Sequence, residues 1–150
     1  MANPLHASAR PSRLPPAAQW LIALLLGLSF FTGVFIWWGQ TLRDRDSAAP
    51  VWLHACTVAH GTLNPFLTGL FGYLVCHHIR IGWELRANLA TGFAMELVFL
   101  VQILTGVGIY YAGAQAWHDG FVWTHRVCGL LFPLAIALHW AAARRYVRRL

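Results

Sequence analysis

The chain has 150 residues, of which 58% are hydrophobic and only 11% are charged. This composition excludes an ordinary water-soluble domain and a disordered chain, and it indicates one domain built from long apolar segments. The net charge of +6 does not indicate nucleic-acid binding, because every basic residue is Arg and most of them flank apolar blocks. The three cysteines form no CxxC pair and are odd in number, which indicates neither a disulfide framework nor a zinc site.

Residues 1–18 are rich in Pro and lack apolar periodicity, so we expect a short flexible cytoplasmic tail. The first apolar block, about residues 20–38, carries no charge and is long enough to span a bilayer. A signal peptide is the alternative, but the run is too long and the charged stretch 43–46 follows it. We expect residues 39–50 to form a polar loop, in which the four charges cancel. Since the first apolar block carries no histidine, we expect it to contribute packing and no chemistry.

The second block, about residues 51–79, exceeds the roughly 20 residues that a span requires. It must tilt, project or bend, and Pro65 supplies a place for a bend. This block carries four histidines, namely His54, His60, His77 and His78. Polar side chains recur in the last two blocks: Glu96 and Gln102 in about 91–112, and His125 and His139 in about 121–143. A basic tail, 146–150, ends the chain.

The arginines predict how these spans are oriented. Eight of the eleven lie before the first block, between the second and third, or after the fourth. Arg is enriched on the cytoplasmic side of membrane proteins, so both termini are expected in the cytoplasm. The sequence therefore predicts an all-α membrane protein in a bacterial-type inner (cytoplasmic) membrane, multi-pass. Its domain, residues 19–145, would be a four-transmembrane-helix up-down-up-down bundle surrounded by lipid.

The two histidines of the last block are fourteen residues apart. In a helix this spacing separates His125 from His139 by about 21 Å along the axis and keeps both rings on about the same side. The second block carries histidines at matching depths. We therefore expect His60 to face His125 near the outer surface, and His78 to face His139 near the inner surface. His78 lies five whole turns from His60, and His77 is the alternative inner residue.

Paired imidazoles within hydrocarbon indicate function, because an unpaired ring is costly there. Zinc or copper requires three or four ligands at one point, whereas a haem iron takes one axial ligand from each side. Two separated pairs thus favour two non-covalent haem b groups, one outer and one inner. Arg126 and Arg80 adjoin the proposed ligands and are candidates to bind the haem propionates, with interface anchoring as the alternative.

Histidines on alternate spans, the fourteen-residue step and the Gly that follows His125 resemble the membrane-integral di-haem b-type cytochromes. These include the cytochrome b subunits of formate dehydrogenases, nickel–iron hydrogenases and thiosulfate reductases, and the haem-binding bundle of quinol–cytochrome c reductases is similar. The resemblance covers about residues 20–145 and implies electron exchange with quinone or quinol and with a partner redox protein. It extends to His60, His125, His139 and one of His77 or His78.

The remaining polar residues leave alternatives open. Glu96 is a candidate for handling quinone protons, or else it pairs with Arg86 or Arg80. His54 is a candidate for the outer quinone side, or else it is solvated. The sequence contains no nucleophile triad, phosphate loop or dinucleotide fingerprint, so we assign no catalytic residue. The leading hypothesis is a membrane electron-transfer subunit. The alternatives are a haem-free anchor or assembly subunit, and an autonomous quinol-linked reductase.

Overall fold

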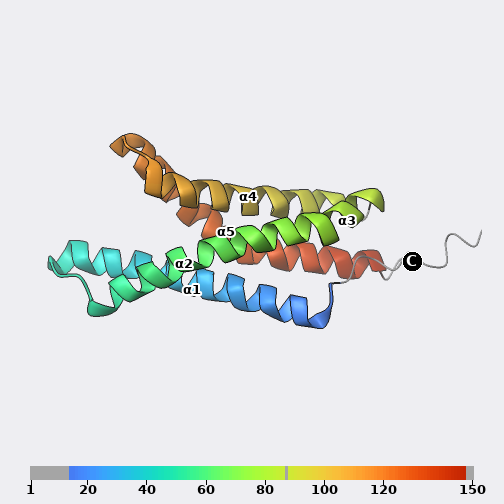
Figure 1. Cartoon of the computed structure of the whole chain (residues 1–150), viewed down its shortest axis with the longest axis horizontal. Helices are drawn as coiled ribbons and strands as arrows, with labels where there is room; N and C mark the ends of the chain where they lie inside the picture. Colours follow the sequence, from blue (N-terminus) through green and yellow to red (C-terminus); the bar gives the residue numbers. More distant parts are fainter. Residues whose placement is uncertain (1–13, 87, 148–150) are drawn as a thin grey trace, which may run out of the picture.

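A computed structural model describes residues 14–86 and 88–147, and all regular secondary structure in these ranges is helical (Figure 1). The elements are α1 (Pro16–Asp46), α2 (Val51–Leu74), a π-helical turn η2 (Val75–Ile79), α3 (Arg80–Glu84), α4 (Leu89–Tyr111) and α5 (Gln115–Val147). Within the described ranges, α1, α4 and α5 are long and apolar enough to cross a membrane.

The helices extend beyond the predicted spans. α1 begins at Pro16, inside the tail predicted for 1–18, and continues through most of the loop predicted for 39–50. It ends where Ser47 adopts a left-handed conformation, and Pro50 directly precedes α2. Exposed polar side chains occupy the last turns of α1, so a helix can project into water there without burying charge. Residues 1–13 and 148–150, which form most of the two predicted tails, lie outside the described residues.

The long helices form two antiparallel hairpins, α1 with α2 and α4 with α5 (Figure 1). The tips of both hairpins lie at one end of the molecule, and the start of α1 and the end of α5 lie at the other. The closest backbone contacts are within the hairpins, and fewer contacts join α2 to α4 and α1 to α5. α2 and α5, which carry the histidines, therefore occupy opposite corners of the bundle.

The buried core is small and lies midway along the bundle. Its members are Leu67, Leu70, Leu74, Phe99 and Phe132. The ring of Phe99 lies 5.2 Å from that of Phe71 and 5.4 Å from that of Phe132. Phe132 is seven residues, or about 10 Å along the helix, from both His125 and His139. This core therefore separates the two depths at which the α5 histidines lie.

Phe99→Ala tests the importance of this core. In a bilayer or detergent, a side chain that leaves the core meets apolar lipid or detergent and not water. The free-energy cost of the substitution therefore comes mainly from the packing lost around the deleted ring. We expect a loss of about 2 kcal/mol, the cavity term for a side chain of this size. Thermal unfolding of the purified protein measures it. Phe93→Ala on the same helix is the control, because Phe93 is 54% exposed; equal destabilisation by both variants would contradict the assignment.

Large apolar side chains also cover the outside of the bundle. Leu24, Phe31, Leu104 and Leu134 are all more than half exposed. The eight tryptophans avoid the middle of the bundle and lie toward its two ends, at positions 20, 37, 38, 52, 83, 117, 123 and 140. An apolar surface bounded by tryptophans is typical of proteins surrounded by lipid. The surface thus agrees with the membrane environment that the composition indicates.

Candidate functional site

Four histidines meet as two pairs inside the bundle. The ring centres of His60 and His125 are 6.0 Å apart, with their planes at 86°. The ring centres of His78 and His139 are 6.2 Å apart, with their planes at 83°. In each pair one residue comes from the α2–η2 segment and the other from α5. The same arrangement is thus built twice, at two depths.

The separation within each pair suits a metal ion held between two rings. A metal–imidazole bond is about 2.0 Å long and the ring centre lies about 1.1 Å beyond the nitrogen, so two imidazoles that bind one metal from opposite sides would have ring centres about 6.2 Å apart. The observed 6.0 and 6.2 Å are close to this distance. Across residues 14–86 and 88–147, no three His, Cys, Asp or Glu side chains form a metal-binding group. A metal that brings its own equatorial ligands, as haem iron does, needs only the two.

All four paired histidines line one cavity of about 1510 Å³, which lies between the helices and is partly open to the outside. A single small-molecule pocket usually has a volume of about 300–1,000 Å³, so this cavity is large enough for more than one such ligand. The core residues Phe99 and Phe132 also line it, between the two pairs. The cavity is largely apolar, with the histidines and a few polar groups at separated positions, as a buried planar cofactor would require.

The structure distinguishes the two adjacent histidines of the second block. His78 faces His139, whereas His77 is exposed and stacks on Tyr73 with ring centres 4.5 Å apart. Nδ1 of His77 also hydrogen-bonds the carbonyl oxygen of Tyr73, at 3.1 Å. Both residues lie in the π-helical turn η2, which holds more residues than an α-helical turn and so changes which side chains face inward.

Threonine hydroxyls bind the outer pair of imidazoles. Thr32 Oγ1 on α1 is 3.0 Å from His60 Nδ1, and Thr105 Oγ1 on α4 is 3.0 Å from His125 Nδ1. Each hydroxyl also donates its proton to a carbonyl oxygen four residues earlier, at 2.6 Å in both cases. The hydroxyl oxygen must therefore accept from the ring, which places the ring proton on Nδ1. The lone pair of each ring is then on Nε2, the nitrogen that can bind a metal.

Polar groups at the start of α4 hold His139. Thr91 Oγ1 on α4 is 3.2 Å from His139 Nδ1 and donates its proton to Asn88 Oδ1, at 2.7 Å. Asn88 Nδ2 in turn donates to the backbone oxygen of His139, at 3.1 Å. Asn88 Nδ2 also lies 3.3 Å from His139 Nδ1, so Thr91 and Asn88 together hold this nitrogen of the ring. The helices without paired histidines thus supply polar groups that orient the rings.

These threonines were missed in the sequence, although a signal was present. Each is followed by a glycine that lies against the same ring, at Gly33, Gly92 and Gly106. A repeated Thr-Gly dipeptide on the spans that lack paired histidines is the pattern that identifies them. The prediction that α1 contributes packing alone is therefore incomplete, because Thr32 contacts His60.

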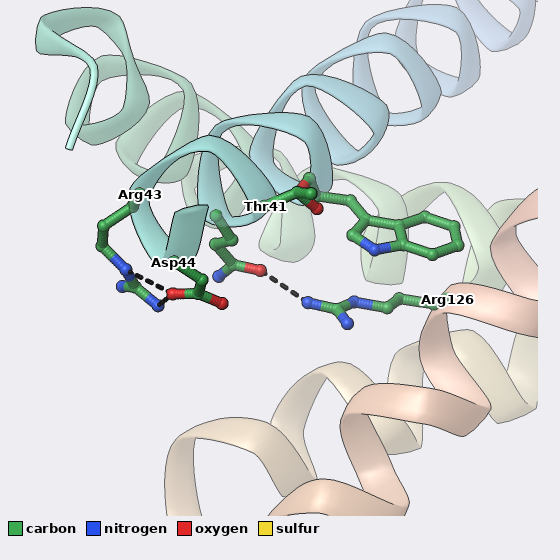
Figure 2. Close-up of polar contacts among 6 residues, drawn as sticks. Thr41, Arg43, Asp44 and Arg126 are labelled. Carbon is green, nitrogen blue, oxygen red and sulfur yellow. Dashed lines mark hydrogen bonds and ion pairs between the residues drawn. The ribbon is translucent and has the colours of Figure 1, made fainter. Parts of the chain in front are cut away.

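The two arginines named from the sequence lie in different surroundings. Arg126 lines the cavity and donates to Gln40 Oε1 at 2.6 Å, the contact dashed at Arg126 in Figure 2. Its guanidinium lies 5.3 Å from the ring centre of Trp37 and 5.5 Å from that of Trp123. Arg80 is exposed, forms an ion pair with Glu84 at 2.9 Å, and does not line the cavity.

At the inner end it is Arg144 that lines the cavity, with its guanidinium 3.4 Å from the ring centre of Trp140. Arg144 follows His139 by five residues on α5, and the sequence prediction had passed over it. An arginine therefore borders the cavity near each histidine pair.

The two candidates for quinone or proton chemistry, Glu96 and His54, also lie in different surroundings. Glu96 lines the cavity, and its Oε2 is buried without a hydrogen-bond partner among the described residues. Arg80 pairs with Glu84, so the predicted alternative of an Arg80–Glu96 pair is not formed. His54 is exposed and lies outside the cavity lining. Of these two candidates for quinone or proton chemistry, only Glu96 is next to the histidine pairs' cavity.

Comparison of the chain with protein-family models, with curated proteins and with solved structures finds no match.

Proposed function

We propose that the protein is a membrane electron-transfer subunit that holds two haem b groups, one in each histidine pair. The main support for this proposal is that the two pairs have similar geometry, with ring centres 6.0 and 6.2 Å apart, and line one shared cavity. His60 and His125 would be the axial ligands of the outer haem, and His78 and His139 those of the inner haem.

The surrounding residues fit this cofactor. Hydrogen bonds to Nδ1 of His60, His125 and His139 leave Nε2 available for an iron atom. Haem also carries two propionate carboxylates, which require cations or hydrogen-bond donors. Arg126 at one end of the cavity and Arg144 at the other can supply these cations. Trp37 and Gln40 hold the side chain of Arg126 in position, and Trp140 holds that of Arg144. When bound, haem iron would supply reversible one-electron chemistry.

The proposed orientation in the membrane follows from the hairpins and the arginines. We propose that α2 with η2 forms a fourth span, in an up-down-up-down arrangement with both termini in the cytoplasm. The hairpin tips lie together at one end of the bundle, and Arg144 and Arg145 lie toward the other (Figure 1). In this orientation His60 and His125 lie near the outer surface of a bacterial-type inner membrane.

The two sites would then form a route for electrons across the bilayer. They are about 21 Å apart along α5, within a hydrocarbon layer about 30 Å thick. We propose quinone or quinol as one redox partner and a separate redox protein as the other, since the described residues are almost entirely helical and the cavity lies between these helices. The unpartnered carboxyl oxygen of Glu96 in the cavity is a candidate group for taking up quinone protons.

The haem content of the purified protein tests this function. We expect a b-type reduced-minus-oxidised spectrum and two haems per chain in a pyridine haemochrome assay. Circular dichroism of the same sample establishes that the helices are folded. A folded sample that binds no haem, even after haem is added, would contradict the proposal and would favour the haem-free anchor or assembly subunit.

A further inference from the structure

The dipeptide Thr-Gly occurs four times in the sequence, at 32–33, 68–69, 91–92 and 105–106. Three of these four copies lie on α1 and α4, the two long helices without paired histidines. Each of these three copies contacts a different member of the histidine pairs. The fourth copy, Thr68-Gly69, lies on α2 itself, where Thr68 donates to the carbonyl oxygen of Asn64 at 3.0 Å.

The two residues of each dipeptide contact the imidazole in different ways. The threonine hydroxyl contacts Nδ1 of His60, His125 or His139, and at His60 and His125 it accepts the Nδ1 proton. The glycine allows the ring to lie close to the helix backbone. A Cβ atom built on Gly33 would be 3.2 Å from His60 Cε1, on Gly106 3.5 Å from His125 Cε1, and on Gly92 3.8 Å from His139 Cε1. The tightest contact, at Gly33, leaves little room for a larger residue.

We propose that these three Thr-Gly pairs are positioning elements that fix the orientation of the axial imidazoles and tune the redox potential of each haem. This inference rests on the proposed function, because it assumes that Nε2 of each ring binds iron. It gives α1 and α4 a direct role in the electron-transfer site. The outer pair is held on both sides, by Thr32 from α1 and by Thr105 from α4.

The hydrogen bond has a predictable electronic effect. An acceptor on Nδ1–H makes the imidazole a stronger base and a better donor to the metal through Nε2. A stronger donor stabilises ferric iron more than ferrous iron, because the ferric ion carries the greater charge. Removing the acceptor should therefore raise the midpoint potential of the haem concerned and should also weaken its retention.

The test replaces threonine by valine, which keeps the branched shape and removes the hydroxyl. In Thr105→Val and Thr32→Val we expect a higher midpoint potential for the outer haem, and retention of that haem weakened about 10- to 100-fold. The inner haem should be unchanged. Thr91→Val should give the reverse pattern, with the inner haem shifted. Redox titration followed by absorbance measures the potentials, and transfer of haem to an excess of apomyoglobin measures retention.

Two controls separate the hydrogen bond from general disturbance of the bundle. Thr105→Ser restores a hydroxyl and should return the potential toward that of the wild type. Thr68→Val changes the copy that contacts no paired histidine and should leave both potentials unchanged. If Thr105→Val does not accumulate as a folded protein, Thr32→Val tests the other ligand of the same haem.

The results distinguish this inference from the proposed function. Valine variants that keep two haems with unaltered potentials would overturn the inference and leave the di-haem function standing. A shift of equal size in Thr68→Val would also overturn it, because that threonine lies away from the rings. A wild-type protein that binds no haem would contradict the proposed function itself.

Discussion

Under the proposed di-haem function, replacing His125 by Ala is expected to reduce the haem content from two per chain to one. The variant removes one ring of the outer pair, whose centres are 6.0 Å apart, and leaves the inner pair complete. The sites are about 21 Å apart along α5, and Phe99 and Phe132 pack between them. Loss of one ligand should therefore have little effect on the other haem. His60→Ala should remove the same haem, because it supplies the opposite ligand.

The pyridine haemochrome assay and the difference spectrum measure this effect. The spectrum of the haem that remains in His125→Ala should match the spectrum that remains in His60→Ala. His54→Ala is the control, since His54 is on the same helix but is exposed and lies outside the cavity lining. If His125→Ala and His60→Ala both retain two haems, these residues do not bind a haem together. The same conclusion would follow if the two variants lost different haems.

Spacing and depth in the sequence were sufficient to predict that His60 meets His125, but for His139 they left His77 open as an alternative to His78. His125 and His139 lie on one face because fourteen residues are close to four helical turns. Their partners on α2 and η2 follow from matching the distance of each histidine from the basic segments. The physical reason is that a span has a fixed rise per residue, so sequence position gives depth.

The side-chain neighbours of the rings were less predictable. Thr32 and Thr105 appear in the sequence as ordinary threonines of apolar helices, where a hydroxyl commonly bonds the carbonyl one turn earlier. They do make that bond, and the oxygen has capacity left to accept from a histidine as well. Arg80 adjoins His78 in the sequence, yet Glu84 lies one turn later and binds it. Contacts of this kind depend on side-chain orientation, which spacing does not fix.

The ends of the helices were also difficult to predict from the sequence. The polar stretch 39–50 was predicted as a loop because charged residues do not lie in hydrocarbon, but α1 continues to Asp46. A helix leaves the membrane without unfolding, since its backbone hydrogen bonds are internal. The charged residues Arg43 and Asp44 then pair with each other in the exposed last turns (Figure 2). Hydropathy locates the membrane-embedded part of a helix, whereas the ends depend on features such as Ser47 and Pro50.

Alanine substitution of His77 and of His78, one at a time, tests the inner site. The two residues are adjacent and receive the same substitution, so each variant is a control for the other. His78→Ala should lower the haem content from two per chain to one, because its ring lies 6.2 Å from that of His139. His77→Ala should keep both haems, because its ring is exposed and stacks on Tyr73. The two variants change the same π-helical turn, so a general disturbance of that turn would affect both.

The same assay and spectra measure the inner haem. The haem lost in His78→Ala should be the one that His125→Ala retains, and the double variant His78→Ala/His125→Ala should bind none. The reverse result, with haem lost in His77→Ala and kept in His78→Ala, would mean that η2 presents the other imidazole to the cavity. An equal loss in both variants would assign the effect to the turn and would refute His78 as the specific ligand. Only an unequal loss, with His78→Ala the defective variant, agrees with the observed pairing of His78 and His139.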